Sequence, residues 1–184
     1  MRKIKLQVQM SVDGFIAGPN GEMDWMVWNW DTQLKDYAGQ LTDSVDCIIL
    51  GRKLAEGFIP YWSSNPQEEG AETINKLPKV VFTNTLKQSI WENTTLATGD
   101  LVEEITKLKK QVGKDIIVYG GADFVASLIE HQLIDEFHFF VNPVILGKGR
   151  IIFNAQAQSN LTLIKAIGFE CGISVLNYRL KQDN

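Results

Sequence analysis

The chain has 184 residues, of which 45% are hydrophobic and 22% are charged, and its formal net charge is −4 at pH 7. This length is typical of a single hydrophobic core, so residues 1–184 are predicted to form one domain. The weak acidic charge provides no general attraction for nucleic acid or an anionic membrane, and any anionic ligand must be held by local groups. No apolar run approaches the roughly 18 residues that span a bilayer, so we expect neither nucleic acid nor membrane as a partner.

The N-terminal segment and the cysteines both favour a cytoplasmic protein. The opening MRKIKLQVQM alternates polar and apolar side chains instead of forming the apolar block of a secretory signal. Cys47 and Cys171 lie in apolar, strand-like contexts without the spacing of metal ligands. We therefore expect buried free thiols and no metal site.

Hydrophobic periodicity predicts that strands and helices alternate up to about residue 133. In residues 3–10 the apolar side chains recur at every second position, as in a strand, and in residues 31–44 they recur at helical spacing. VDCIIL at 45–50 is almost entirely apolar, as in a strand that is covered on both faces. The other predicted elements of this part are strands at 79–83 and 115–119 and helices at 67–76, 101–112 and 122–133.

The chain then changes character, because three strands follow one another without a helix, at 135–142, 161–170 and 172–180. Alternation followed by consecutive strands predicts an α/β fold with three α/β/α layers, in which a mostly parallel central sheet carries antiparallel C-terminal strands. The apolar strand at 137–141 and the closing strands would leave an edge that needs covering, so we expect a homodimer. In such sheets ligands bind beyond the carboxyl ends of the strands.

One of these strand ends is rich in glycine. Gly120 and Gly121 directly follow the strand at 115–119 and come just before the predicted helix at 122–133. Glycine allows the backbone to approach a ligand, and the unpaired N–H groups of the helix N-terminus beyond it suit a diphosphate. The alternative is a tight turn that binds nothing, because the motif is not a complete GxGxxG.

Two further strand ends carry groups that can bind phosphate. Gly51-Arg52-Lys53 places a guanidinium at the carboxyl edge, where it can bind a phosphate with paired hydrogen bonds, although Arg52 can also be a solvated cation at a helix start. Thr83 and Asn84 offer a hydroxyl and an amide to a phosphate or ribose, or else they only form a turn. Together the three strand ends favour a dinucleotide with phosphates.

Between the first strand and the first helix, Trp25, Trp28 and Trp30 fall within six residues. Aromatic rings stack on flat heterocycles, so this tryptophan loop is a candidate substrate site. The alternative is a hydrophobic lid that packs on the core or on a dimer partner.

Five runs of the sequence together resemble the dihydrofolate-reductase-like superfamily. More closely they are similar to the riboflavin-biosynthesis reductase domain, the C-terminal half of the bacterial bifunctional deaminase-reductase, in a small stand-alone form. The resemblance implies a three-layer α/β/α fold, NADPH as cofactor and frequent homodimers. The runs are SVDGFIAG (11–18), ILGRK (49–53), LPKVVFTNTL (77–86), IIVYGGADFVASLI (116–129) and NPVILGKGRIIF (142–153).

The resemblance also implies roles for particular residues. Gly51-Arg52 and Thr83-Asn84 would lie near the adenosine phosphates, and the backbone of Ile16 and Ala17 would lie near the nicotinamide. The diphosphate would be cradled by Gly120, Gly121, Ala122 and Asp123.

Hydride transfer to a C=O or C=N group needs a proton, so a carboxylic acid is expected near the nicotinamide. Asp31, which opens the first helix, is the first candidate, Asp13 is the second and Asp24 is the third. Asp31 can instead be a helix N-cap and Asp13 a turn residue. His131 and His138 lack partners at ligand spacing and are interpreted as structural.

The substrate is left open by one departure from the family pattern. Riboflavin-synthesis enzymes carry an aspartate-aspartate-proline stretch where this chain has Lys53 to Phe58, and no deaminase zinc motif is present. We expect an NADPH-dependent reductase that transfers a hydride to a flat heterocycle or to a carbonyl or imine, similar to 5-amino-6-(5-phosphoribosylamino)uracil reductase or dihydrofolate reductase. The alternatives are a non-catalytic nucleotide- or heterocycle-binding protein, and a flavin- or folate-linked reductase with another cofactor preference.

Overall fold

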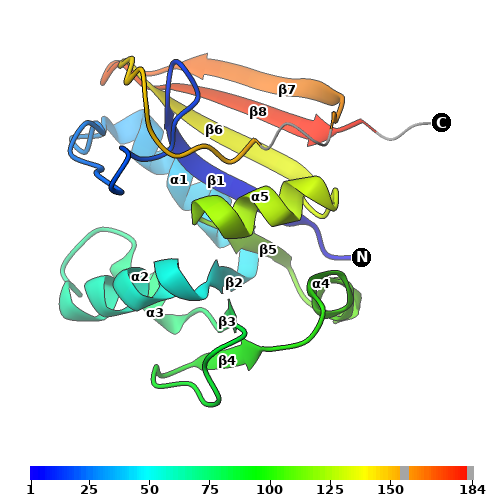
Figure 1. Ribbon diagram of the computed structural model, residues 1–184. Coiled ribbons are helices and arrows are strands. Elements are labelled where there is room, and N and C mark those ends of the chain that lie inside the picture. The colour runs from blue at the N-terminus through cyan, green and yellow to red at the C-terminus, as the bar shows by residue number, and fades with distance from the viewer. Residues whose placement is uncertain (154–157, 182–184) are drawn as a thin grey trace.

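The computed structural model describes residues 1–153 and 158–181, which form an eight-stranded sheet with helices on both faces (Figure 1). The strands are β1 (Ile4–Ser11), β2 (Val45–Gly51), β3 (Lys79–Phe82), β4 (Thr94–Ala97), β5 (Asp115–Val118), β6 (Glu136–Asn142), β7 (Leu161–Gly168) and β8 (Ser174–Leu180). The helices are α1 (Thr32–Asp43), α2 (Arg52–Ser64), α3 (Ala71–Lys76), α4 (Leu101–Lys110) and α5 (Ala122–Glu130).

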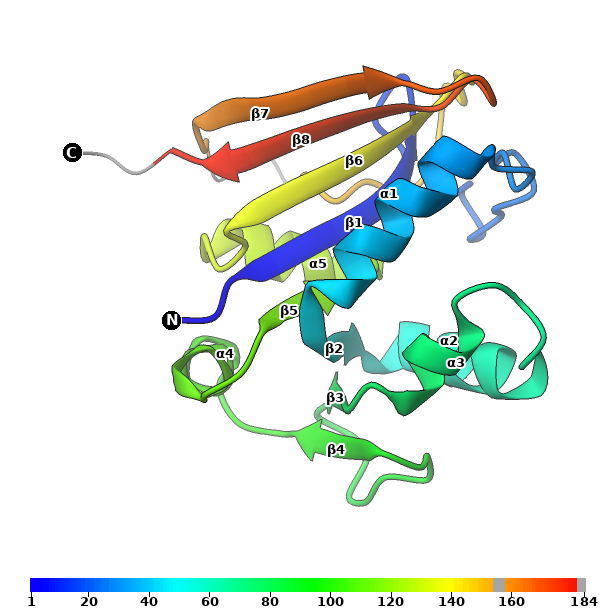
Figure 2. The same ribbon diagram turned by 180° about the vertical axis from the view of Figure 1, so that it is seen from behind.

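The strand order is β4-β3-β2-β5-β1-β6-β8-β7. The pairs from β4 to β6 are all parallel, whereas β8 pairs antiparallel with both β6 and β7. Helices α1, α2 and α3 pack on one face, and α4 and α5 pack on the other (Figures 1 and 2). The predicted fold class, with a mostly parallel sheet and antiparallel C-terminal strands between helical layers, is confirmed.

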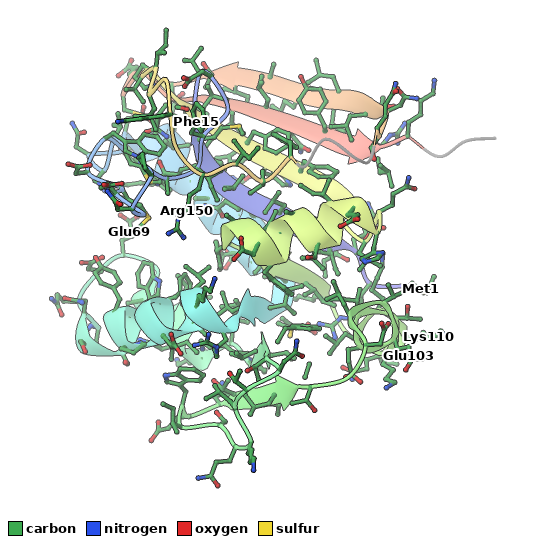
Figure 3. The ribbon with its side chains drawn as sticks, viewed as in Figure 1. Met1, Phe15, Glu69, Glu103, Lys110 and Arg150 are labelled. Atoms are coloured by element: carbon green, nitrogen blue, oxygen red, sulfur yellow. The ribbon has the colours of Figure 1, made fainter. Side chains whose placement is uncertain are left out.

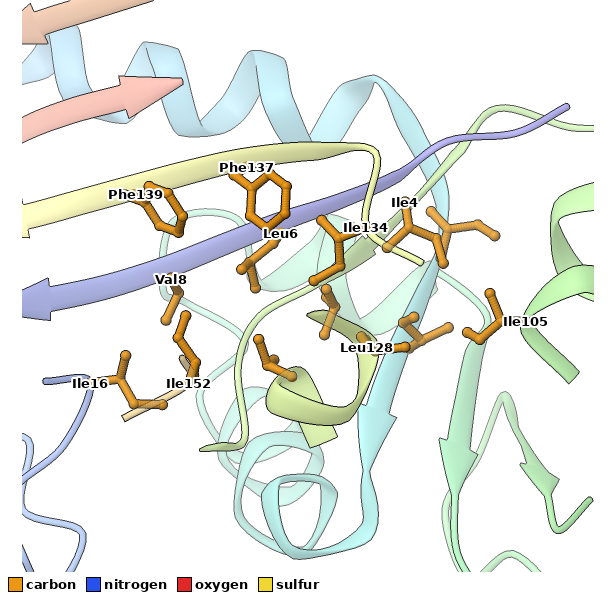
Figure 4. Close-up of a cluster of buried hydrophobic side chains, with 14 of the residues drawn as sticks. Ile4, Leu6, Val8, Ile16, Ile105, Leu128, Ile134, Phe137, Phe139 and Ile152 are labelled. Atoms are coloured by element: carbon orange, nitrogen blue, oxygen red, sulfur yellow. The ribbon is translucent and has the colours of Figure 1, made fainter. Parts of the chain in front are cut away.

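The core explains why the sequence folds in this way. In β1 the alternate residues Ile4, Leu6 and Val8 lie in one cluster with α5 residues such as Leu128 (Figure 4). In β2, by contrast, Ile48, Ile49 and Leu50 are all fully buried because helices cover both faces of that strand. The alternating pattern of β1 reflects one buried and one half-buried face, whereas the continuous apolar run in β2 reflects burial on both faces.

Two elements differ from the sequence-based expectations. The helix expected at 67–76 begins only at Ala71, and a longer helix, α2, precedes it. Helix α2 was not predicted because Gly57 and Pro60 lie inside it, and proline removes a hydrogen bond from the helix interior. The short strand β4 was also not predicted; its four residues, of which two are threonines, give little apolar signal.

The expected position of the sheet edge also needs correction. The strand at 137–141 is part of β6, which lies between β1 and β8 and so is not an edge. The edge on this side is β7, in which Leu163 and Ile164 are about half exposed. The residues of 137–141 therefore need no partner subunit to cover them. No helix in the described parts of the chain has the length and apolar character needed to cross a membrane.

Candidate functional site

The N-termini of α2 and α5 meet at the carboxyl edge of the sheet. Their preceding strands, β2 and β5, are parallel neighbours. A methyl group placed on Gly51 would lie only 2.8 Å from Cβ of Phe124, so glycine is what permits the close approach of the two segments. Lys53 Nζ lies 3.0 Å from Asp123 Oδ2 across the gap. The structure therefore brings together residues 51–53 and 120–123, as the sequence predicted.

The two helix N-termini at this edge have no side-chain caps among the described residues. Helices α1 and α4 differ, because the carboxylates of Asp31 and Asp100 accept hydrogen bonds from Leu34 N–H and Glu103 N–H, respectively. Uncapped first-turn N–H groups and the positive end of the helix dipole suit an anion. The open amides of α2 and α5 are therefore the feature of this edge that best fits a diphosphate.

The backbone before α5 depends on glycine. Gly120 and Gly121 have φ values of +135° and +88°, which other residues rarely adopt. A Cβ added at Gly120 would have no heavy atom within 4 Å, so the space beside this residue is open. The Gly-Gly pair thus provides both the turn and room beside it for a bound group.

Arg52 is the first residue of α2, and its side chain is 32% exposed. Its Nη1 donates to Glu56 Oε1 at 2.6 Å, one turn along the same helix. A guanidinium has five N–H donors, so this pair leaves others for a phosphate. The Lys53–Asp123 pair is strongly exposed, and an ion pair of that kind contributes little stability.

The Thr83-Asn84 turn lies beside this edge, because β3 pairs with β2 so that Phe82 is opposite Gly51. Thr83 is buried, and its Oγ1 accepts hydrogen bonds from the N–H groups of Thr85 and Leu86, both at 3.1 Å. The hydroxyl oxygen therefore holds the turn. The Asn84 side chain is exposed and is better placed than Thr83 to contact a ligand.

Ile16 and Ala17 are fixed by the segment that follows β6. Ile16 N–H donates to Arg150 C=O at 2.9 Å, and Arg150 N–H donates to Ala17 C=O at 2.8 Å. A side chain at Gly149 would clash with the Ala17 carbonyl, so glycine allows the two segments to lie together. This bridge holds the backbone that the resemblance places near the nicotinamide.

Arg150 was missed by the sequence analysis. Its exposed side chain extends from this bridge toward the side occupied by α2 (Figure 3). It adds a second guanidinium near the candidate site of an acidic protein. The only sequence signal was the Gly-Lys-Gly-Arg run at 147–150, whose glycines allow the bridge to form.

The two candidate acids are both held by backbone amides. Asp31 Oδ1 accepts from Leu34 N–H at 2.9 Å and Oδ2 accepts from Cys171 N–H at 3.0 Å. These bonds hold the pKa of Asp31 below its usual value. Its carboxylate is thus ionised at neutral pH, and its N-cap geometry matches the alternative interpretation.

Asp13 caps the loop that follows β6. Its Oδ2 accepts from Gly147 N–H at 2.7 Å and its Oδ1 accepts from Leu146 N–H at 3.1 Å. A hydrogen bond from Ser11, together with these amides, lowers the pKa of Asp13. Like Asp31, it is arranged to keep its charge and not to donate a proton, and the catalytic roles of both remain predictions.

The three tryptophans have different surroundings. Trp30 stacks on Phe140 with ring centroids 5.6 Å apart, and its Nε1 donates to Val27 C=O. Trp25 Nε1 donates to Glu22 C=O, whereas Trp28 is 62% exposed. A cavity of about 310 Å³ lies beside Trp30 and Asp31 at the start of α1. Trp30 therefore packs on the core, and Trp28 is the ring most accessible to a ligand.

Asn142, at the end of β6, is a second residue that the sequence analysis missed. It is fully buried, its Oδ1 accepts from Val27 N–H at 2.8 Å, and its Nδ2 donates to Gln9 Oε1 at 3.1 Å. One amide thus joins β6, β1 and the middle of the tryptophan loop, at Val27. An asparagine at the end of an apolar strand was the available signal, but its partners are distant in sequence.

The histidines and cysteines are not arranged as a metal centre. His138 is buried and its Nδ1 lies 2.7 Å from the Tyr37 hydroxyl. Cys47 is a buried free thiol whose pKa burial raises to about 11, and Cys171 is a free thiol that is only half-buried. Over residues 1–153 and 158–181, no group of three or more His, Cys, Asp or Glu side chains could hold a metal ion.

Comparison with known proteins identifies the family. The RibD C-terminal domain family matches residues 2–175. The chain belongs to that family. Protein YyaP of Bacillus subtilis (strain 168), whose name states no activity, is 34% identical over 183 residues, covering 96% of this chain and 94% of YyaP. YwjB of the same organism is 28% identical over 164 residues, covering 89% of this chain and 90% of YwjB.

Solved structures with low sequence identity share the fold. A protein of Shewanella sp. PV-4 that is named for riboflavin biosynthesis has a TM-score of 0.77 and 22% identity, covering 99% of this chain and all of that one. The Thermotoga maritima diaminohydroxyphosphoribosylaminopyrimidine deaminase/5-amino-6-(5-phosphoribosylamino)uracil reductase has a TM-score of 0.72 and 17% identity, covering 98% of this chain and 57% of that one. The RibD family therefore has a reductase-like fold to which this chain conforms over its whole length.

Proposed function

We propose that this protein is an NADPH-dependent reductase that transfers a hydride to a flat heterocycle or to a carbonyl or imine group. The observation that carries the proposal is the pair of uncapped helix N-termini, α2 and α5, that meet beside Arg52 at the carboxyl edge of the sheet. Membership of the RibD C-terminal domain family supports a reductase.

The residues at this edge fit a dinucleotide phosphate. The first-turn amides of α2 and α5 would bind the diphosphate, and the open space beside Gly120 gives it room. Arg52 would bind the 2′-phosphate that distinguishes NADPH from NADH, and Asn84 would contact the adenosine moiety. When bound, NADPH supplies the hydride.

The protein's own contribution would be to hold the two reactants in contact and to exclude water. The Ile16–Ala17 backbone, fixed by Arg150, would border the nicotinamide, and Trp28 would stack on the substrate. Because Asp31 and Asp13 are held as carboxylates, the proton would come from solvent. We extend the proposal to a homodimer with a small-molecule substrate in the cytoplasm, on the strength of the family resemblance alone.

The test is a titration of the purified protein with NADPH and with NADH while tryptophan emission is recorded. We expect saturable, NADPH-selective quenching, followed by oxidation of NADPH when pteridines, pyrimidinones and simple carbonyl or imine compounds are added. The absence of NADPH binding would overturn the cofactor assignment, whereas equal affinity for NADH would overturn its selectivity.

A second candidate is a non-catalytic protein that binds a nucleotide or heterocycle on the same fold. The observation that favours it is the engagement of both candidate acids by backbone amides. In the titration above, it would give tight binding of NADPH or a heterocycle without turnover across the whole panel of acceptors.

A further inference from the structure

A second cavity lies on the α1 face of the sheet, away from the edge that carries Arg52. It has a volume of about 210 Å³ and is bordered by the second half of α1 and by β1, β6 and β8. Figure 2 shows α1 crossing this face, with β8 and β7 beyond it. The lining residues are Lys5, Tyr37, Gln40, Leu41, Ser44, Glu136, His138 and Asn177.

Two buried side chains on the wall of this cavity have polar atoms without a hydrogen-bond partner among the described residues. They are Asn177 Oδ1 and His138 Nε2, in residues that are only 8% and 4% exposed. His138 Nε2 lies 3.1 Å from Glu136 Oε1, but it is not aligned with that oxygen as a hydrogen bond requires. A buried polar atom without a hydrogen-bond partner costs free energy. The wall of the cavity therefore lacks hydrogen-bond partners for these two atoms.

The ionisable groups that line the cavity are Lys5, Tyr37, Glu136 and His138. Lys5 Nζ lies 3.0 Å from Asp115 Oδ2 and donates to Ser44 Oγ, so its charge is already compensated. The Glu136 side chain is only 16% exposed, and Lys3 Nζ is 3.9 Å away on a side chain that is 61% exposed, while Lys5 also favours the charged form of Glu136. Exposed ion pairs at that distance contribute little. Glu136 is therefore a largely buried carboxylate whose neighbouring basic groups are the His138 ring, at 3.1 Å, and the exposed Lys3.

The surroundings of Glu136 also determine the protonation state of its carboxyl group. The proximity of the His138 ring, whose Nε2 lies 3.1 Å from Glu136 Oε1, is the main cause that lowers the pKa of Glu136 to about 2. The carboxylate is thus charged at neutral pH. Its Oε1 receives only a long hydrogen bond, 3.4 Å, from Asn177 Nδ2. The wall consequently offers acceptors, a carboxylate and an amide oxygen, next to the aromatic rings of Tyr37 and His138.

We propose that this cavity is a binding site for a small organic cation with N–H donors, of the primary ammonium or amidinium type. The donors would pair with Glu136 and Asn177 Oδ1, and the apolar part would lie against Tyr37 and Leu41, where an aromatic face also favours a cation. At ~30 Å³ per water, a volume of 210 Å³ equals about seven waters, which is enough for a flat molecule of modest size.

The probe for this site is benzamidine, with benzoate and benzyl alcohol as matched anionic and neutral rings. We expect isothermal titration calorimetry to give one saturable benzamidine site and no benzoate or benzyl alcohol site. Binding should weaken at least tenfold in Glu136→Gln. It should also be lost in Gln40→Trp, which places a bulky ring at the exposed mouth and leaves the buried network untouched.

Gln33→Trp is the control, because Gln33 lines the other cavity, beside Asp31. This variant should bind benzamidine as the unsubstituted protein does. Absence of saturable binding, equal binding of benzoate, or benzamidine binding that is lost in Gln33→Trp but retained in Gln40→Trp would overturn the proposal. Because Gln40 is exposed, that arm of the test stands even if Glu136→Gln does not fold.

Discussion

Four of the five helix N-termini in the described residues form two contrasting pairs. At α1 and α4 an aspartate side chain, Asp31 or Asp100, accepts the hydrogen bond of a first-turn amide. At α2 and α5 the position before the helix is a glycine, Gly51 or Gly121, which has no side chain to do so. Helices α2 and α5 follow neighbouring strands and meet at one place, whereas α1 and α4 begin elsewhere. The six-residue α3 also follows an uncapped glycine, Gly70, but it comes after α2 and not after a strand.

The capped helix N-termini contribute to stability, whereas the uncapped ones are available for binding. A cap satisfies the helix amides from within the chain and therefore stabilises the fold. An uncapped N-terminus leaves the same amides for an external anion, at the expense of that stabilisation. Substitutions beside the uncapped helices should therefore change ligand affinity, whereas substitutions of the caps should change the free energy of unfolding. The following predictions test that contrast.

The largest effect is expected at Arg52, beside the uncapped helices. Arg52→Ala should weaken NADPH binding by about 1–3 kcal/mol, the range for loss of a charge-assisted partner, and should change NADH binding little. Fluorescence titrations with both cofactors measure this. Lys76→Ala is a matched control, because Lys76 forms a similar pair with Glu72 on α3, and it should change neither affinity. Equal losses of affinity for NADPH and for NADH would show that Arg52 does not bind the 2′-phosphate.

A smaller effect, on stability alone, is expected at Asp100, which caps α4. Asp100→Ala should lower the free energy of unfolding by about 0.5–2 kcal/mol, because Glu103 N–H loses its acceptor. Urea denaturation with and without NADPH would measure it, and the affinity for NADPH should remain unchanged. A large change in that affinity would contradict the division between capped and uncapped helices.

The smallest effect is the pH dependence of the cap at Asp31. Its pKa in the folded protein lies below the ordinary value of 3.8, so the stabilisation is present above that value and is lost as the pH falls below it. Asp31→Asn should therefore be less stable than the unsubstituted protein at pH 7, with a difference that shrinks in acid. Thermal unfolding across the pH range measures this; a constant difference would show that the charge is not involved.

Much of the scaffold could be predicted because it depends on local patterns. The alternation in β1 and the apolar run in β2 reflect how deeply the two faces of each strand are buried, and the glycines at 51, 120 and 121 mark strand ends. Helix α2 could not be predicted, because packing of Ala55 and Ile59 against the sheet overrides the local effects of Gly57 and Pro60.

The site was less predictable because its geometry joins distant segments. Asn142 contacts Gln9 and Val27, which are 133 and 115 positions away, and no local pattern encodes such a pairing. Arg150 joins the site only through its bridge to Ala17. For Asp31, the sequence left an acid and an N-cap as alternatives, and only the positions of the Leu34 and Cys171 amides show that the cap geometry is present.

The amide of Asn142 has a consequence for how this scaffold can diversify. It fastens Val27 of the tryptophan loop to the neighbouring strands β1 and β6, while the adjacent Trp28 is 62% exposed. The Trp28 side chain can therefore be exchanged over evolution without altering the pairing of β1 with β6. A lineage that keeps this asparagine can therefore vary the exposed ring while the position of the loop backbone is retained.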